Sequence, residues 1–574
     1  MSTYEDGLEY DIIFAGGGTS ACVAAGRLAK AGPNLTILII ERGRNNLNDP
    51  IITNPNAIFY QAESEPALNG QARIVAAGGV LGGGSSINAM MYARAQGVDF
   101  DSFRTDGWDS KNLVEYVKKL ETVHLDDQLL EKSTHGFSGP VNVTFGTHAP
   151  KGPQDDFLVA AESYGIPEIH DLQDFKAIGG FNRSAKFIGL DGKRQDAVHC
   201  YVNPLMADGN HQNLHTLAES KVSRVIFEGN HAFGVEYKPE KTFLQQGTSL
   251  TKGIAKTIKA RKLVVVSAGA LGTPSILERS GVGNKELQAG VDILLVSNLP
   301  GVGENYQDHH FLLPTYKTSL GADETLDGLI TGRRDFVKAL GERDSILGWN
   351  GIDIGGKLRM TNEEVATLGP EFKTMWDKDF ANCPKRPIML MGVIAGLMGD
   401  HKMLDEGPDG VQQYVTMASY TPYPYPLWAY KKGRDIYRRT NAFEGEVATG
   451  HPKFREGSRA ALSEGPLKTS GFCSVKDRSR IPPVEYDEED NRAIEDFVRA
   501  NVQTTWHSLG TCKMAPRDEG GVVDKYLNVY GTRGLKCADL SIIPENIGAN
   551  TNNMALIVGE KAADIIGKVF GLVV

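Results

Sequence analysis

The sequence predicts an α/β protein in which a Rossmann-like domain is joined to an α+β domain built on an antiparallel sheet. Three observations support this. A strand, a glycine turn and a helix follow one another near the N-terminus. The chain contains 65 glycines, several of them clustered, and its 574 residues exceed what one hydrophobic core usually holds. Clustered glycine indicates places where the backbone approaches a ligand closely.

The N-terminal unit has the order strand, glycine turn, helix, strand, acid. Residues 10–15 and 35–40 are apolar runs rich in strand-forming residues, and residues 21–30 favour a helix. Glu41 ends the second strand, 20 residues after Ala21. This arrangement matches the dinucleotide-binding fingerprint, with alanine at the third glycine position.

Each residue of this unit has an expected role. Gly16 makes the tight turn, and Gly18 leaves space for the pyrophosphate beside the backbone. Thr19 and Ser20 follow at the helix N-terminus, whose free N–H groups attract phosphate. Glu41 accepts hydrogen bonds from the ribose hydroxyls, and its charge disfavours a 2′-phosphate. The fingerprint alone does not separate FAD from NAD, and a surface turn is its simplest alternative.

Further segments carry a family resemblance. They are residues 80–88 (VLGGGSSIN), residues 269–283 (GALGTPSILERSGVG), and residues 506–512 (WHSLGTC) with Asp539 downstream. With the fingerprint, they resemble the glucose–methanol–choline (GMC) oxidoreductases from residue 10 to about residue 567. Residues 41–50 and 544–551 are most similar to fungal and yeast alcohol (methanol) oxidases. Within that family the resemblance implies a fold of the p-hydroxybenzoate-hydroxylase type.

The resemblance implies noncovalently bound FAD. Residues 81–88 would lie along the flavin ring and pyrophosphate, with Asn88 near the reactive edge. Val222 would hold the adenine through its backbone, and Asp539 would bind the ribityl or pyrophosphate region. An ordinary strand valine and a helix-capping acid are the alternatives for these two. The predicted cofactor site comprises Gly16, Gly18, Thr19, Ser20, Glu41, Leu81, Gly83, Ser85, Asn88, Val222, Asp539 and Thr551.

Alcohol oxidation removes a hydroxyl proton and a hydride from the carbon that bears it. The hydride goes to flavin N5, and the proton needs a base with a pKa near the working pH. His507 lies in the segment that matches the family's catalytic motif, and the alternative is a structural histidine. Asn550 fills the family's partner position, where it would donate to the substrate oxygen. A helix-capping role is the alternative for Asn550.

Departures from the relatives bear on the substrate and the cofactor. Ala89 stands where methanol-active relatives carry an aromatic residue beside the flavin, and the chain is shorter after residue 426. We therefore expect a pocket formed by Ala89, Met90 and Trp506 that accepts a primary alcohol larger than methanol, although Met90 or Trp506 could fill the space. Gly79 replaces a polar family residue, which would remove a contact near the flavin.

The resemblance to alcohol oxidases favours O₂ as the electron acceptor, with hydrogen peroxide as product, and another acceptor stays open. His309 and His310 are interpreted as structural, and no metal site is expected. Two alternatives share the fold, namely a flavin-retaining hydroxynitrile lyase and a catalytically impaired FAD-binding homologue. An NAD-dependent dehydrogenase is the alternative from the fingerprint alone.

The predicted FAD-binding domain is discontinuous and comprises residues 1–150, 195–315 and 500–574. The substrate-binding domain comprises residues 151–194 and 316–499. Short mixed runs within residues 141–188 and 387–417 suit the antiparallel sheet. Helices are expected over residues 428–439, 487–501 and 553–570.

Composition and charge argue against several classes of protein. The net charge is −10 without a long basic run, which argues against nucleic-acid binding, and no run of 18 apolar residues suits a membrane span. Six scattered cysteines predict neither a zinc site nor a disulfide framework. The N-terminus lacks a signal peptide and the C-terminus lacks a peroxisomal tripeptide, so a cytoplasmic location is expected. The expected partners are a small-molecule alcohol and O₂, and a homo-oligomer is compatible with the sequence.

Overall fold

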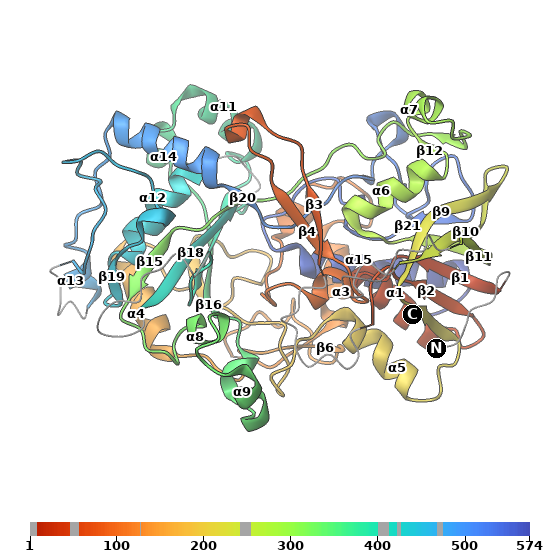
Figure 1. Cartoon of the computed structure of the whole chain (residues 1–574), viewed down its shortest axis with the longest axis horizontal. Coiled ribbons are helices and arrows are strands. Elements are labelled where there is room, and N and C mark those ends of the chain that lie inside the picture. Colours follow the sequence, from red (N-terminus) through yellow and green to blue (C-terminus); the bar gives the residue numbers. More distant parts are fainter. Residues whose placement is uncertain are drawn as a thin grey trace.

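The computed structural model describes residues 8–45, 57–126, 128–240, 254–399, 412–421, 426–467 and 474–574. These residues form two lobes that lie side by side, each built on one large sheet (Figure 1). Residues 1–7, residues 46–50 of the resemblance segment, residues 422–425 and Cys473 lie outside the described residues.

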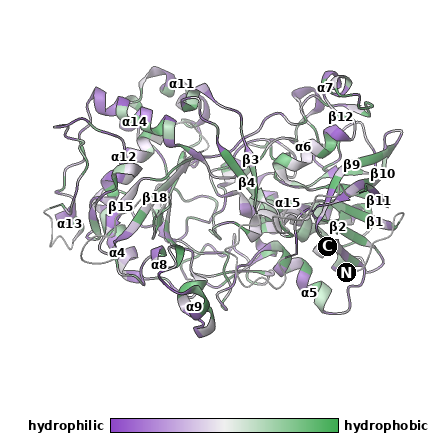
Figure 2. Cartoon of the chain, viewed as in Figure 1, coloured by the Kyte–Doolittle hydropathy of each residue, from purple (hydrophilic) through white to green (hydrophobic). Residues whose placement is uncertain are grey.

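The first sheet confirms the predicted Rossmann-like domain. Its strand order is β8-β2-β1-β11-β10-β9, and β21 pairs with β11. These strands are β1 (Glu9–Ala15), β2 (Ile37–Ile40), β8 (Leu214–Leu217), β9 (Ser220–Glu228), β10 (His231–Pro239), β11 (Lys256–Val266) and β21 (Leu535–Cys537). The β1, β2, β8, β11 and β21 pairings are parallel. All of β2 and residues 12–15 of β1 are apolar and buried, as expected for parallel strands that are covered on both faces (Figure 2).

Helices pack on this sheet and on one another. They include α1 (Thr19–Ala31), α3 (Ser110–Leu120), α6 (Gly269–Arg279) and α15 (Thr551–Val569). α15 packs on α1 and α3. Gly559 permits the close approach of α15 to α1, because a Cβ there would lie 2.6 Å from Val23 Cβ. The smaller elements of this lobe are α2 (Gly97–Asp101), α5 (Asn203–Ala207), α7 (Lys285–Gly290), β3 (Ala57–Gln61), β4 (Ile74–Gly78), β5 (Glu121–Val123), β6 (Val141–Val143), β12 (Val282–Gly283) and β13 (Ser297–Asn298).

The second sheet is antiparallel, as predicted. Its order is β19-β15-β18-β17-β16-β7, and β14 pairs with both β18 and β20. The strands are β7 (Gly180–Arg183), β14 (His310–Leu312), β15 (Thr315–Thr318), β16 (Ile352–Leu358), β17 (Met389–Ile394), β18 (Gln413–Thr421), β19 (Phe443–Glu446) and β20 (Gln503–Thr504). The helices of this lobe are α4 (Lys151–Ser163), α8 (Asp327–Ile330), α9 (Phe336–Glu342), α10 (Asn362–Ala366), α11 (Gly369–Asp379), α12 (Pro426–Tyr437), α13 (Val475–Arg478) and α14 (Glu488–Asn501).

The second sheet separates a core from a cavity. Met417 of β18 and Met391 of β17 pack with Trp428 of α12 in the buried core. Ala418 and Tyr420, which alternate with that face along β18, line the cavity instead. This alternation follows from the two-residue period of a strand.

Three strands depart from the predicted assignment. β14 and β20 lie in ranges assigned to the FAD-binding domain, yet they pair with the second sheet. β6 lies in a range expected to join that sheet, yet it pairs with β5. The partner of a strand this short cannot be predicted from its own sequence, because the pairing is determined by tertiary packing. The pairing of β14 with β20 brings His309 and His507 together.

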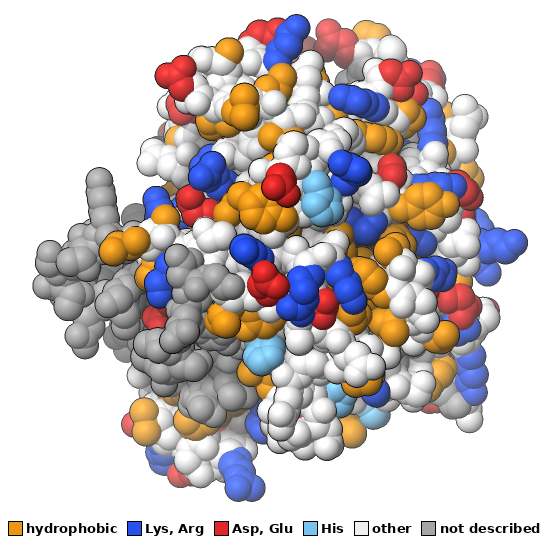
Figure 3. Space-filling model, turned by 90° about the vertical axis from the view of Figure 1, so that its right-hand side faces the viewer, with side chains coloured by type: hydrophobic (Ala, Val, Ile, Leu, Met, Phe, Trp, Pro, Cys, Tyr) orange, Lys and Arg blue, Asp and Glu red, His pale blue; other side chains and the backbone are white. Residues whose placement is uncertain are grey.

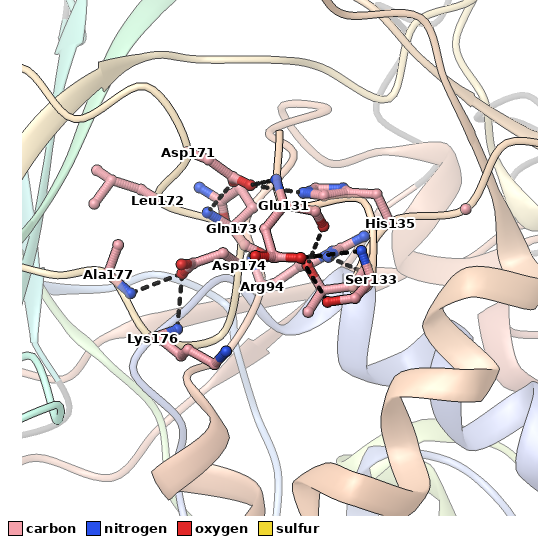
Figure 4. A network of polar contacts seen from close by, with 12 residues as sticks. Arg94, Glu131, Ser133, His135, Asp171, Leu172, Gln173, Asp174, Lys176 and Ala177 are labelled. Atoms are coloured by element: carbon pink, nitrogen blue, oxygen red, sulfur yellow. Dashed lines mark hydrogen bonds and ion pairs between the residues drawn. The ribbon is translucent and has the colours of Figure 1, made fainter. Parts of the chain in front are cut away.

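A buried polar network joins ranges that were predicted to belong to different domains (Figure 4). Arg94 donates to the carbonyl oxygens of Thr134 and Gln173, each at 2.9 Å, and it pairs with Glu121. His135 lies 3.1 Å from the Asp171 carboxylate. Removal of one member would leave a buried polar group without its partner, so this network holds residues 171–173 against residues 94–135.

The surface drawn in Figure 3 carries Lys and Arg intermingled with Asp and Glu, without a broad area of one sign. Among the described residues, no helix has the length and apolar character needed to cross a bilayer.

Candidate active site

One cavity of about 720 Å³ runs between the two lobes. It reaches from the glycine turn after β1 to the cavity-facing side of the second sheet. Most of the predicted cofactor-binding residues line one end, and the predicted catalytic residues line the other. Its size is typical of cofactor and small-molecule sites.

The glycine turn lies at one end of the cavity. Gly16 has φ +109°, and a Cβ there would lie 2.5 Å from the Ser267 carbonyl oxygen, so only glycine fits the turn. A Cβ on Gly18 would meet nothing closer than 3.6 Å, because this glycine faces the cavity. A Cβ on Gly83 would lie 2.8 Å from Gly18 Cα, so the second glycine segment packs directly on the first.

The N-termini of three helices face this cavity. They are α1 at Thr19 and Ser20, α6 at Gly269, and α15 at Thr551. Each directs the positive end of its dipole toward the same space, which suits the two negative charges of a pyrophosphate. The cavity wall therefore fits the predicted dinucleotide.

The predicted adenosine contacts also lie on the wall. Glu41 is buried and accepts hydrogen bonds from the Gly17 and Gly43 amides, each at 2.8 Å. Burial raises the pKa of its carboxyl group. Val222 lies on β9 and lines the cavity. Glu41, the ribose contact expected from the fingerprint, and Val222, the adenine contact implied by the resemblance, thus line the same cavity.

Asp539 has two roles in the structure. Its carboxylate caps a short 3-10 helix by accepting from Ser541 N at 2.8 Å, which is the alternative weighed from sequence. It also accepts from Gly269 N at 2.8 Å and from Thr273 Oγ1 at 2.6 Å, and it lines the cavity. Burial raises its pKa. Asp539 thus positions the N-terminus of α6 at the cavity wall.

Two residues of the predicted cofactor site lie behind the wall. Leu81 is fully buried, and its side chain packs where a Cβ on Gly17 would stand. Ser85 donates to the Gly82 carbonyl at 2.7 Å and accepts from Ala197 N at 3.1 Å. Gly79 also does not line the cavity, and its backbone packs against Gly43. Gly79, Leu81 and Ser85 thus support the glycine-rich segment from behind. The residues of this segment that line the cavity are Gly83, Gly84, Ile87, Asn88 and Ala89.

His507 and Asn550 lie together at the other end of the cavity. His507 Nε2 and Asn550 Nδ2 are 3.4 Å apart, and both residues line the cavity. Asn550 occupies the N-cap position of α15 but makes no side-chain capping bond. Its Oδ1 accepts a hydrogen bond from Tyr420 OH instead. Asn550 thus caps α15 by position only, and its side chain bonds to Tyr420 rather than to the helix.

The hydrogen-bond partners fix the protonation of His507. His309 Nε2 lies 2.8 Å from the Ile547 carbonyl oxygen, so this nitrogen carries a proton and Nδ1 of His309 is an acceptor. His507 Nδ1 lies 3.1 Å from His309 Nδ1, so His507 donates there. The lone pair of His507 then sits on Nε2, which faces Asn550 and the cavity.

Asp308 holds the turn that carries His507. Its Oδ1 accepts from His507 N at 2.9 Å and from His309 N at 2.7 Å, and its Oδ2 accepts from Tyr306 OH and Thr504 Oγ1. Within this turn Trp506 has φ +60°, which is unusual for a bulky residue. The hydrogen bonds of Asp308 maintain this conformation.

His309, which was interpreted as structural, is buried and joins the Ile547 carbonyl oxygen to the ring of His507. The ligand atoms of Asp308, His309 and His507 lie within 4.8 Å of one another, as in a cluster that could hold a metal ion. Here the carboxylate is occupied by hydrogen bonds and the two rings pair with each other.

Burial lowers the pKa of His507 to about 4 and that of His309 to about 3. This differs from the near-neutral pKa that the residue type alone suggested. The shift disfavours the charged form, so both rings are neutral at physiological pH. His507 is therefore ready to accept a proton at any pH above its own pKa.

We predict a flat pH profile for cofactor reduction. The rate constant at saturating substrate should stay constant between about pH 6 and pH 9 and fall below about pH 5, as His507 becomes protonated. Anaerobic stopped-flow absorbance across this range measures it. A decline centred near pH 7 would show that burial does not control this base.

The predicted pocket residues lie on the same wall. Ala89 lines the cavity, and its carbonyl accepts from Asn350 Nδ2 at 2.7 Å. Met90 has φ +57° and also lines the cavity. Trp506 is 54% exposed, and its indole N–H lies 3.3 Å from the Ile74 carbonyl. Trp506 therefore lines the cavity with more than half of its surface open to solvent.

Several site residues were not identified from the sequence. They are Asp308 and Tyr420, the first turn of α6 at Gly269–Gly272, and Arg194. Gly269 lay in a segment singled out for the family resemblance without an assigned role. Tyr420 carried no local signal, because its place opposite Asn550 depends on the pairing of β18 with β14.

Comparison with known proteins identifies close relatives. A family model described as GMC oxidoreductase matches residues 10–311 in its N-terminal part and residues 427–559 in its C-terminal part. Alcohol oxidase of Pichia angusta is 36% identical over 644 aligned positions, covering 98% of this chain and 95% of the relative. Alcohol oxidase 1 of Komagataella phaffii is 35% identical with the same coverage. A solved FAD-dependent oxidoreductase of Chaetomium thermophilum superposes with a TM-score of 0.76 at 23% identity, covering 98% of this chain and 100% of that one.

Proposed function

Because this chain belongs to the GMC oxidoreductase family, whose cofactor is FAD, we propose that it oxidises a primary alcohol to the aldehyde. The observation that carries the proposal is the pairing of His507 Nε2 with Asn550 Nδ2 at the cavity wall, 3.4 Å apart. One nitrogen is a lone-pair acceptor and the other an N–H donor, so a single hydroxyl oxygen between them satisfies both. The family also excludes the NAD-dependent alternative.

The residues perform three tasks in this proposal. Bound FAD supplies the hydride acceptor, N5 of the flavin. His507 Nε2 takes the hydroxyl proton as the carbon loses its hydride. Asn550 Nδ2 donates to the substrate oxygen while negative charge develops there, and Tyr420 keeps this amide oriented by donating to its Oδ1. His309 holds His507 in the tautomer that exposes Nε2.

The acceptor we propose is O₂, reduced to hydrogen peroxide. Support comes from the relatives that are named alcohol oxidases and that align over nearly the full length of this chain. Peroxide formed in step with aldehyde, one for one, tests this proposal, and aldehyde formation that depends on an added quinone would contradict it.

Replacement of Asn550 tests the electrostatic role. Asn550→Ala should slow flavin reduction on the order of 10²-fold, because it removes one donor to the developing oxyanion. Asn550→His should retain more activity, since its ring can also donate. Rapid-mixing absorbance of the anaerobic protein measures both variants. Equal rates for Asn550→Ala and the wild type would remove Asn550 from the mechanism.

The lining of the cavity supports an apolar substrate larger than methanol. On the substrate side the lining is dominated by apolar side chains, which are Met90, Met91, Phe311, Leu326, Ile330, Ile352, Ile394, Met398 and Ala418. Small residues widen it, among them Ala89 and Gly392. Each buried methylene adds about 0.8 kcal/mol of binding, so this space favours a longer or aromatic alcohol.

We predict that butanol or benzyl alcohol gives a higher kcat/KM than methanol. Ala89→Phe should shift this ranking toward methanol, because a ring beside the flavin would fill the space for larger substituents. The test compares kcat/KM for the three alcohols in both proteins. Methanol as the best wild-type substrate would refute the size proposal, as would an unchanged ranking in Ala89→Phe.

A further inference from the structure

A buried arginine beside the glycine-rich segment has no role in the chemistry described above. Arg194 is 8% exposed, and it lines the cavity next to Asn88. Its Nη1 donates to Asn88 Oδ1 at 2.8 Å, to the Asn88 carbonyl at 2.7 Å and to the Ser85 carbonyl at 3.1 Å. All three acceptors are neutral.

The rest of this guanidinium lacks protein partners. Nε is buried and makes no hydrogen bond, and none is found for Nη2 within the described residues. The charge of Asp196 raises the pKa of Arg194, but its carboxylate is engaged by Ser86 Oγ and His199 Nδ1, each at 2.6 Å. Burial lowers the pKa of Arg194 only to about 10, so its positive charge persists at neutral pH. A buried cation without a contacting carboxylate is costly unless a ligand compensates it.

Arg194 also fixes the direction of the Asn88 amide. Asn88 Oδ1 accepts both from Arg194 Nη1 and from Met90 N, the latter at 2.9 Å. The oxygen is therefore turned into the protein. The Nδ2 donors of Asn88 remain for the cavity, which Asn88 lines. The amide donor of Asn88 and the positive charge of Arg194 thus lie next to each other on the cavity wall.

We propose that Arg194 is a positioning and electrostatic residue for the flavin, which holds the Asn88 donor toward the ring and stabilises the reduced cofactor over the oxidised one. Reduced FAD carries more negative charge than oxidised FAD, and a fixed cation in a water-poor site attracts that charge strongly. The alternative is that Arg194 only stabilises the conformation of residues 85–88. That role would require the same hydrogen bonds but not the positive charge.

The midpoint potential of bound FAD separates these two roles. Arg194→Met should weaken binding of reduced FAD relative to oxidised FAD about tenfold or more, which lowers a two-electron potential by about 30 mV. Arg194→Lys keeps the charge and should stay near the wild-type potential. Lys221→Met is the matched control, because it removes a cation from the same cavity beside Val222, and its potential should not change.

An isosteric variant covers the case in which Arg194 variants fail to fold or to hold FAD. Asn88→Asp places a carboxylate against Arg194 without changing side-chain volume, and it should lower the potential in the same direction. Equal potentials in the wild type, Arg194→Met and Asn88→Asp would overturn the proposal. So would an equal lowering in Arg194→Met and Arg194→Lys. Neither result would bear on alcohol oxidation, because the potential is measured by dye equilibration without substrate.

Discussion

Replacement of His507 by alanine is expected to leave FAD bound and to slow its reduction by alcohol on the order of 10²–10⁴-fold. We propose that the imidazole takes the substrate proton, because its Nε2 lone pair faces Asn550 in the cavity. FAD should remain, because the predicted dinucleotide contacts lie elsewhere on the cavity wall. Single-turnover reduction, with FAD content determined on the same sample, measures both effects.

His124→Ala is the matched control for this variant. His124 is exposed, and its ring bonds only to Asn142 among the described residues. It should reduce FAD at the wild-type rate. A wild-type rate in His507→Ala would mean that another group accepts the proton. Loss of FAD from His507→Ala would assign this residue to cofactor retention instead.

Gly18→Val is expected to abolish FAD retention. Gly18 forms the N-cap of α1 and faces the cavity, where the fingerprint places the pyrophosphate. A single Cβ is tolerated by the protein, since the nearest atom would be Ser267 O at 3.6 Å. The two branches of valine must then extend into the space of the phosphates. Flavin absorbance per protein after purification measures the loss.

Gly18→Ala provides a graded comparison, and it should retain more FAD than Gly18→Val. Gly152→Val is a control for the substitution itself, because a Cβ on Gly152 would meet nothing within 4 Å. Full flavin content in Gly18→Val, with normal folding, would show that the pyrophosphate does not pass this glycine.

The Rossmann-like half could be predicted from local sequence. β1, the glycine turn, α1 and β2 appear in the predicted order, because apolar runs, glycine and helix formers carry local signals. The helix predicted over residues 487–501 is α14, and Asp487 forms a capping box with Asp490. The closing helix predicted over residues 553–570 is α15, which begins two residues earlier.

The proposed catalytic residues at the other end of the cavity could be predicted only in part. His507 and Asn550 were found through the resemblance, whereas the contact between His309 and His507 depends on β14 and β20. Each of these strands has only two or three residues, and the pairing joins segments about two hundred positions apart. The lowered pKa of His507 also arises from burial by distant segments, which residue type cannot reveal.

The most direct test of the account is anaerobic mixing of the wild-type protein with butanol or benzyl alcohol, while the visible band of oxidised flavin and the aldehyde are followed together. The account predicts that the flavin band bleaches completely and that one aldehyde forms per FAD, since we propose that His507 takes the hydroxyl proton while the flavin accepts the hydride. An alcohol panel that leaves the flavin oxidised, as expected for a hydroxynitrile lyase or an impaired homologue, would contradict it.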